Sequence, residues 1–139
     1  MAIEVSINYL AVLVAAIISM ILGALWYSPL LFGNAWMKSA GLTKEFMEKH
    51  KKGMSWRYLF AFLGSLLMAY VLAHFVDYTG STTFLLGMTN GFWIWLGFFV
   101  PVLLGSILWE GKKLVFYFIN ITYHFISLLI MGGILAVWQ

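Results

Sequence analysis

The stretch from Tyr9 to Tyr27 reads YLAVLVAAIISMILGALWY and contains no charged residue. A helix needs roughly 20 mainly apolar residues to cross a bilayer, because the hydrocarbon core is about 30 Å thick and each residue rises about 1.5 Å. Similar segments follow at residues 58–76, 83–109 and 114–138. Their runs are continuous rather than alternating, which favours helices over barrel strands. The sequence therefore predicts an all-α integral membrane four-helix bundle, a single transmembrane domain over residues 1–139.

The composition excludes a water-soluble domain. Only 9% of the residues are charged and 63% are hydrophobic, whereas soluble domains are about 25% charged and about 45–50% apolar. The chain has no cysteine, which excludes disulfides, thiolate metal sites and thiol catalysis. No pair of histidines or carboxylates has ligand spacing on one helix, so we expect no metal site and no cofactor.

The positions of the basic residues predict the orientation. All eight Lys and Arg residues lie in loop 28–57 or in the turn after the third span. Such residues mark cytoplasmic connections, so we expect the N-terminus, turn 77–82 and Gln139 to be non-cytoplasmic, in a multi-pass protein of the cell (inner) membrane. Residues 9–27 lack the features of a cleaved signal and are expected to be a permanent span. Anionic lipids are the expected partner of the basic loop, and nucleic acid is not.

The loop at residues 28–57 is expected to lie on the membrane surface. Ser28-Pro29 is expected to end the first helix, because proline lacks an N–H and disfavours helix in the residue before it. Thr43 is a predicted N-cap for a short amphipathic helix over residues 44–52. This helix is predicted to rest at the interface. The apolar residues before it are expected to lie along the same interface: Leu30, Leu31, Phe32, Trp36 and Met37.

Polar side chains within the spans are candidate functional groups, because they are costly in lipid. His124 lies near the middle of the fourth span, with Asn120 one turn away on the same face, and Asn90 lies in the third span. These three are the predicted polar core or ligand-facing residues. A hydrogen bond to a neighbouring helix and a proton relay or ligand contact both remain open for His124. His74 and Asp77 are a predicted polar pair at the non-cytoplasmic end of the second span.

Small residues recur at every fourth position in the first two spans, the third span carries further glycines, and together they predict a compact bundle rather than a wide pore. They let helix backbones approach closely where burial from water no longer drives association. Pro101 is expected to bend the third span. Trp93 and Trp95 are expected either to fill the bundle or to form an aromatic wall for a ligand. The small-residue positions are Ala11, Ala15, Ser19 and Gly23 in the first span, Ala61, Ser65, Ala69 and Ala73 in the second, and Gly87, Gly91, Gly97 and Gly105 in the third.

Three motifs resemble a known family. GALWYSPLLFGNAW at residues 23–36, WEGKK at 109–113 and INITYH at 119–124 resemble a small bacterial and fungal membrane family catalogued as domain of unknown function 1761. The resemblance covers nearly the whole chain and implies a four-span membrane protein, but no activity. It also implies that the Asn120/His124 face is a family feature, together with a cytoplasmic interface motif: Trp26, Tyr27, Ser28, Pro29, Phe32, Gly33, Trp36 and Glu110.

Three functions remain open, and the absence of a recognisable catalytic motif favours a non-enzymatic one. The leading hypothesis is a packing or assembly protein that forms a homo-oligomer or serves as an accessory subunit of a membrane complex. The alternative is a small transporter or channel with a polar path through Asn90, Asn120 and His124. The third hypothesis is a membrane enzyme or binding protein for a lipid or quinone, placed beside Trp93 and Trp95.

Overall fold

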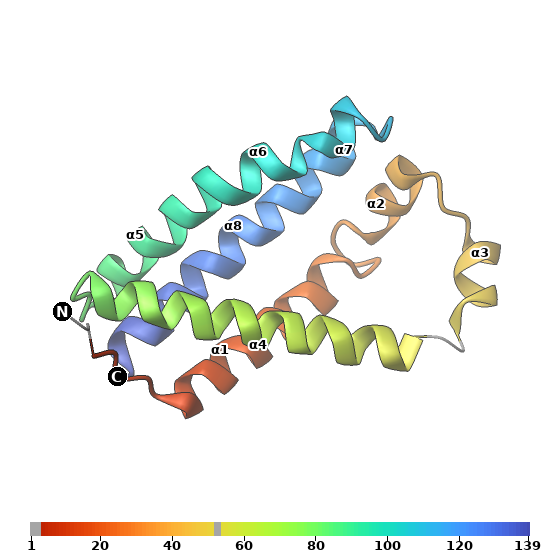
Figure 1. Ribbon diagram of the computed structural model, residues 1–139. Coiled ribbons are helices and arrows are strands. Elements are labelled where there is room, and N and C mark those ends of the chain that lie inside the picture. The colour runs from red at the N-terminus through yellow and green to blue at the C-terminus, as the bar shows by residue number, and fades with distance from the viewer. Residues whose placement is uncertain (1–3, 52–53) are drawn as a thin grey trace.

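The computed structural model describes residues 4–51 and 54–139, which form helices and no β-strand. Four helical segments dominate the bundle (Figure 1): α1 (Tyr9–Trp26), α4 (Met54–Tyr78), the interrupted helix α5–α7 (Phe84–Leu108) and α8 (Leu114–Val137). Each is long and apolar enough to cross a membrane, which confirms the predicted all-α architecture. Their bounds lie within one residue of the predicted ones, except that α4 begins four residues earlier and ends two residues later.

Local caps and short turns explain where these helices begin. The side chain of Asn8 accepts hydrogen bonds from the backbone N–H groups of Leu10 and Ala11, at 3.1 and 3.2 Å. Thr83 caps the third span in the same way by accepting from the N–H of Leu86 at 3.2 Å. These contacts satisfy amide groups that the first helical turn leaves without a partner. Gly80, with φ of +64°, supplies the left-handed residue in the turn between α4 and α5.

Helix α8 lies at the centre of the bundle and packs against α1, α4 and α5. The first described residues and the C-terminus lie at one end (Figure 1), which we call the terminal end. Here the side chain of Asn8 donates to the carbonyl oxygen of Trp138, and that of Gln139 donates to the carbonyl oxygen of Ser81, in the turn at residues 79–83. The other end, with α2 and α3, is here called the basic end. Helix α4 meets α5 near the terminal end and diverges from α6 and α7 towards the basic end (Figure 1). Because of this divergence, α4 and the third span are not packed together along one side of the bundle.

Two seams of small residues hold the helices together. Between α1 and α4 the buried residues Ala11, Ala15 and Ala69 allow close approach of the backbones. Between α5 and α8, a Cβ atom on Gly87 would overlap the carbonyl oxygen of Gly132. The small-residue stripe predicted on the second span is used only in part, because Ala61 lies exposed where α4 has diverged.

The third span is interrupted near Pro101. Residues Trp95–Phe99 form a π-helical turn, η2, followed by α6 (Val100–Leu103) and α7 (Gly105–Leu108). Proline has no N–H to donate to the preceding turn, and a wider π turn changes the hydrogen-bond register at this point. The hydroxyl group of Tyr117 donates to the carbonyl oxygen of Val100 at 2.8 Å and so satisfies part of the irregular backbone.

The connection between α1 and α4 contains two short helices, α2 (Gly33–Ala40) and α3 (Lys44–Lys49). Thr43 caps α3 by accepting a hydrogen bond from the N–H of Phe46 at 3.1 Å. The helix predicted over residues 44–52 ends at Lys49, and Lys52 lies outside the described residues. Helix α2 packs against α8, with the ring of Trp36 stacked 6.1 Å from that of Phe116.

Candidate functional site

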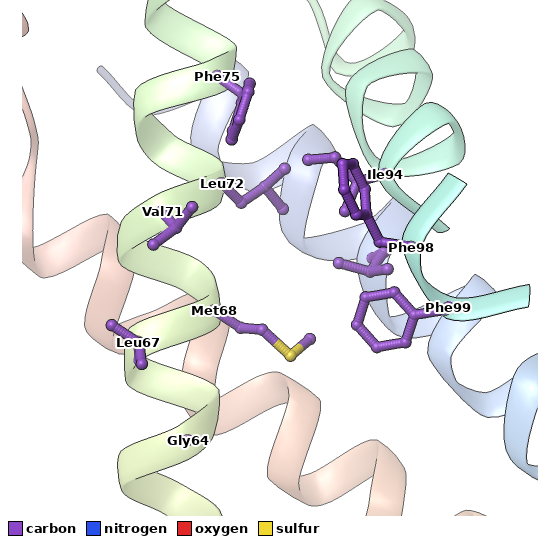
Figure 2. Close-up of a pocket in the computed structure, with 10 residues that line it drawn as sticks. Gly64, Leu67, Met68, Val71, Leu72, Phe75, Ile94, Phe98 and Phe99 are labelled. Carbon is purple, nitrogen blue, oxygen red and sulfur yellow. The ribbon is translucent and has the colours of Figure 1, made fainter. Parts of the chain in front are cut away.

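A groove lies between α4 and the third span, where the two helices diverge (Figure 2). Its middle part has a volume of about 380 Å³ and an apolar lining that includes Gly64, Met68, Leu72 and Leu128. A second part towards the terminal end has a volume of about 500 Å³. Both parts are lined by Phe75, Ile94 and Phe98. The two parts are therefore adjacent sections of the groove, with these three side chains at their common boundary.

Glycine and the π-helical turn shape the apolar section. A Cβ atom at Gly64 would meet no other atom within 4 Å, so this position leaves open space on α4. In Figure 2, Met68 and Leu72 extend from α4 towards the side chains of the third span. Phe98 and Phe99, at the end of η2, line the opposite wall. The apolar section is thus bounded by flexible and aromatic side chains.

The terminal-end section contains a network of uncharged polar groups. The side-chain amide of Asn90 donates to the hydroxyl groups of Ser81 at 2.8 Å and Thr79 at 3.1 Å. The side-chain amide of Gln139 donates to the backbone carbonyl of Ser81 at 2.9 Å. Thr89 also lines this section. The groove therefore carries polar groups among apolar side chains at its terminal end, whereas its middle is apolar.

The three predicted polar-core residues do not form one cluster. Asn90 belongs to the terminal-end network, whereas Asn120 accepts a hydrogen bond of 2.6 Å from the hydroxyl group of Tyr27 near the basic end. His124 packs between aromatic rings, 4.8 Å from Phe99 and 4.9 Å from Tyr123. Its buried Nδ1 atom has no hydrogen-bond partner among the described residues. The three side chains lie in three different environments.

The predicted pair of His74 and Asp77 lies in the last turns of α4, at the terminal end. The Nδ1 atom of His74 lies 2.8 Å from the carbonyl oxygen of Tyr70, within its own helix. Asp77 lines a small crevice with Asn8 and Trp138 at the terminal end. Each residue therefore has a local environment of its own.

Most of the predicted interface motif comes together at the basic end. The indole N–H of Trp26 donates to the carbonyl oxygen of Ile119 at 3.1 Å, and its ring lies 4.6 Å from that of Phe32. The hydroxyl group of Ser28 donates to the carbonyl oxygen of Leu25 at 2.6 Å. A Cβ atom on Gly33 would overlap the backbone carbonyl of Tyr27. These contacts fold the chain back tightly after α1.

Other members of the motif lie around this corner. The ring of Tyr27 lies 5.6 Å from that of Trp36 in an edge-to-face arrangement. Pro29 and Glu110 are both exposed. The corner therefore has a packed aromatic part and an exposed part.

A set of hydroxyl groups between α1 and α8 was not among the predicted site residues. The hydroxyl group of Tyr123 donates to the carbonyl oxygen of Ser19 at 2.9 Å, and the hydroxyl groups of Ser19 and Ser127 lie 2.7 Å apart. The spacing of Tyr123 and Ser127, four residues apart on one helix face, could have indicated this set. It joins the first and fourth spans.

Replacement of His124 by phenylalanine is expected to leave the fold intact and to raise its stability by about 1 kcal/mol. The change removes a buried nitrogen that has no partner and keeps an aromatic ring against Phe99. Thermal unfolding in detergent, followed by tryptophan fluorescence, measures this effect. A loss of more than 1 kcal/mol would show that the imidazole makes a stabilising polar contact.

Comparison with known proteins finds one family. The family model described as "Protein of unknown function (DUF1761)" matches residues 10–136 of this chain. The match includes all four long apolar helices, from the second residue of α1 to the last turn of α8. No curated protein and no solved structure matches the chain.

Proposed function

This chain belongs to the DUF1761 family, and we propose that it is a non-enzymatic membrane protein that acts by assembling with a second copy of itself. The proposal rests on residues 55–61, which we call the bare segment of α4. Every side chain of this segment is exposed, whereas Leu72 and Ala73 further along the same helix are buried. About two turns of α4 are thus not covered by another helix among the described residues.

A gap beside the bare segment supports a helix–helix contact. It has a volume of about 330 Å³ and lies between α1, α4 and α8, with Gly23, Ala24 and Ala61 in its lining. Small residues permit close approach of another helix, and van der Waals packing drives such association in lipid. A side chain from the α4 helix of a second copy would fill this gap.

The composition of the bare segment favours a symmetric contact. Trp56, Leu59 and Phe60 expose large apolar surfaces, with exposed fractions of 56%, 56% and 62%. In a two-fold symmetric dimer the same patch serves on both subunits, so a patch of rings and aliphatic chains can pack against its own copy. We therefore place the assembly interface on α4 near the basic end.

Cysteine cross-linking tests this proposal directly, because the chain has no native cysteine. Single cysteines are introduced at Tyr58, Leu59, Phe60 and Ala61, which cover all sides of the helix. In native membranes we expect an oxidant to produce disulfide dimers at the positions that face the second copy and not at the others. Leu85→Cys is the matched control, because Leu85 is 72% exposed on α5, away from the bare segment.

Two results would contradict self-assembly at this place. One is a single monomer mass in lipid nanodiscs together with no cross-link at any of the four positions. The other is a higher yield of disulfide dimer for Leu85→Cys than for any of the four variants in the bare segment.

A further inference from the structure

We propose that the groove between α4 and the third span binds a single-chain membrane lipid whose uncharged head group carries a hydroxyl. The head group lies in the terminal-end section, beside Asn90, and the chain follows the apolar section towards Phe99. A monoacylglycerol and a long-chain isoprenoid alcohol share this chemistry. The groove is lined by parts of α4 outside the bare segment, so the proposal does not depend on self-assembly.

The distribution of polar groups along the groove matches an amphipathic molecule. Thr79, Ser81, Thr89 and Asn90 line only the terminal-end section, and the residues that line the middle are apolar or glycine. A ligand that was polar throughout would place unpaired groups against the apolar wall, at a cost in free energy. A molecule with one polar end and one long apolar end meets both sections.

The hydrogen bonds of the network favour a donating head group. The side-chain carbonyl of Asn90 lies 3.2 Å from the hydroxyl oxygen of Thr79, whose single proton also has the backbone carbonyls of Phe75 and Val76 within 3.1 Å. At least one of the two lone pairs of the amide oxygen is therefore free. The hydroxyl group of Thr89 donates to the carbonyl oxygen of Leu85 at 3.0 Å and keeps its own acceptor capacity. The groups that remain open are acceptors, so a hydroxyl of the ligand supplies the missing donor.

The lining also argues against a phosphate head group. No Lys, Arg, His, Asp or Glu lines either section of the groove within residues 4–51 and 54–139. A charge placed there would lose its water without gaining an opposite charge, which is strongly unfavourable. Helix α3 and the turn after α7 carry basic residues and lie at the basic end, whereas the network of Asn90, Ser81 and Gln139 lies at the terminal end (Figure 1).

The groove opens towards the surrounding lipid rather than into a closed interior. Leu67, Trp93 and Phe98 at its rim are 64%, 62% and 67% exposed. Each section also falls in the range of about 300–1,000 Å³ that is usual for ligand pockets. A lipid therefore enters sideways from the bilayer without passing through water.

The π-helical turn defines the deep end of the groove. Such turns are frequent at functional sites, and this one carries Phe98 at the rim and Phe99 inside. Phe99 lies against His124 and so separates the groove from the buried imidazole. The chain of the ligand ends at this ring.

Photo-crosslinking with a filled-groove variant tests the site. The full-length protein in phosphatidylcholine nanodiscs is exposed to monooleoylglycerol with a diazirine in its chain. We expect labelling of α4 and η2, reduced about tenfold or more by Gly64→Phe, because the new ring occupies the volume of several methylene groups. Gly64 has open space around it, so the variant should keep its melting temperature. The control variant Leu85→Phe, whose substitution lies outside the groove, should be photo-labelled to the same extent as the wild type.

Unlabelled competitors identify the head group. Displacement by monooleoylglycerol or by a long-chain isoprenoid alcohol supports the proposal and distinguishes the two sources. Methyl oleate has the same chain without a hydroxyl donor, and equal displacement by it would overturn the assigned head group. Displacement by phosphatidylglycerol alone would overturn the uncharged class. Labelling spread evenly over all lipid-facing helices, or unchanged in Gly64→Phe, would overturn the site.

Discussion

Replacing Gly132 by alanine is expected to destabilise the bundle by about 3 kcal/mol, because the added methyl group overpacks the contact between α5 and α8. A Cβ atom on Gly132 would overlap the carbonyl oxygen of Gly87. Backbone cannot rotate away as a flexible side chain can, so the two helices must separate. Gly91 lies one turn further along the same contact, against the backbone of Leu128, and would be displaced as well. Reversible unfolding in mixed micelles measures the free energy.

Gly64→Ala is the matched control for this prediction. The same substitution is made inside a long apolar helix, but at a position with no other atom within 4 Å of the new Cβ. Because alanine favours a helix over glycine by about 1 kcal/mol, this variant is expected to be as stable as the wild type or slightly more stable. Equal losses in Gly132→Ala and Gly64→Ala would show that the α5–α8 contact is not the tight seam described here.

The four long helices could be predicted from the sequence because length and apolar composition alone determine them. The cap at Thr43 was also predictable, since a hydroxyl residue directly before a helical segment has one common role. Gly87 and Gly91 were expected to face another helix, and they contact α8. The same prediction was wrong for Gly97, which lies in η2. The π-helical turn changes the helix register there, and a Cβ atom on Gly97 would have no neighbour within 4 Å.

The groove could not be predicted, because it depends on distances between helices. The divergence of α4 from the third span leaves no trace in the local spacing of residues. Asn120 illustrates the same limit: the sequence indicated a polar residue in lipid but not that Tyr27, 93 positions away, donates to it. Trp93 and Trp95 are only two residues apart, yet Trp93 lines the groove while the N–H of Trp95 donates to the carbonyl oxygen of Ile121 at 2.7 Å.

Replacing Trp26 by alanine is expected to lower the free energy of unfolding by about 3 kcal/mol, at the lower end of the range for buried tryptophan. On sequence grounds Trp26 belongs to the predicted cytoplasmic interface motif, and the structure buries this side chain to 9% exposure. The substitution removes the hydrogen bond to the carbonyl of Ile119 and the ring contact with Phe32, and it leaves a cavity where α1 meets α8. Unfolding in mixed micelles, monitored by circular dichroism, provides the measurement.

Trp109→Ala separates this effect from the general loss of an interfacial tryptophan. Trp109 lies at the same end of the bundle but is 86% exposed, so its replacement is expected to change stability by less than about 0.5 kcal/mol. Trp26→Phe divides the loss further, because it keeps a six-membered aromatic ring and removes the N–H donor together with the rest of the five-membered ring, at an intermediate cost of about 2 kcal/mol. If Trp26→Ala and Trp109→Ala were equally stable, the indole of Trp26 would be an ordinary interfacial anchor. A graded series from Trp26→Phe to Trp26→Ala instead identifies it as the side chain that fixes the first span against the fourth.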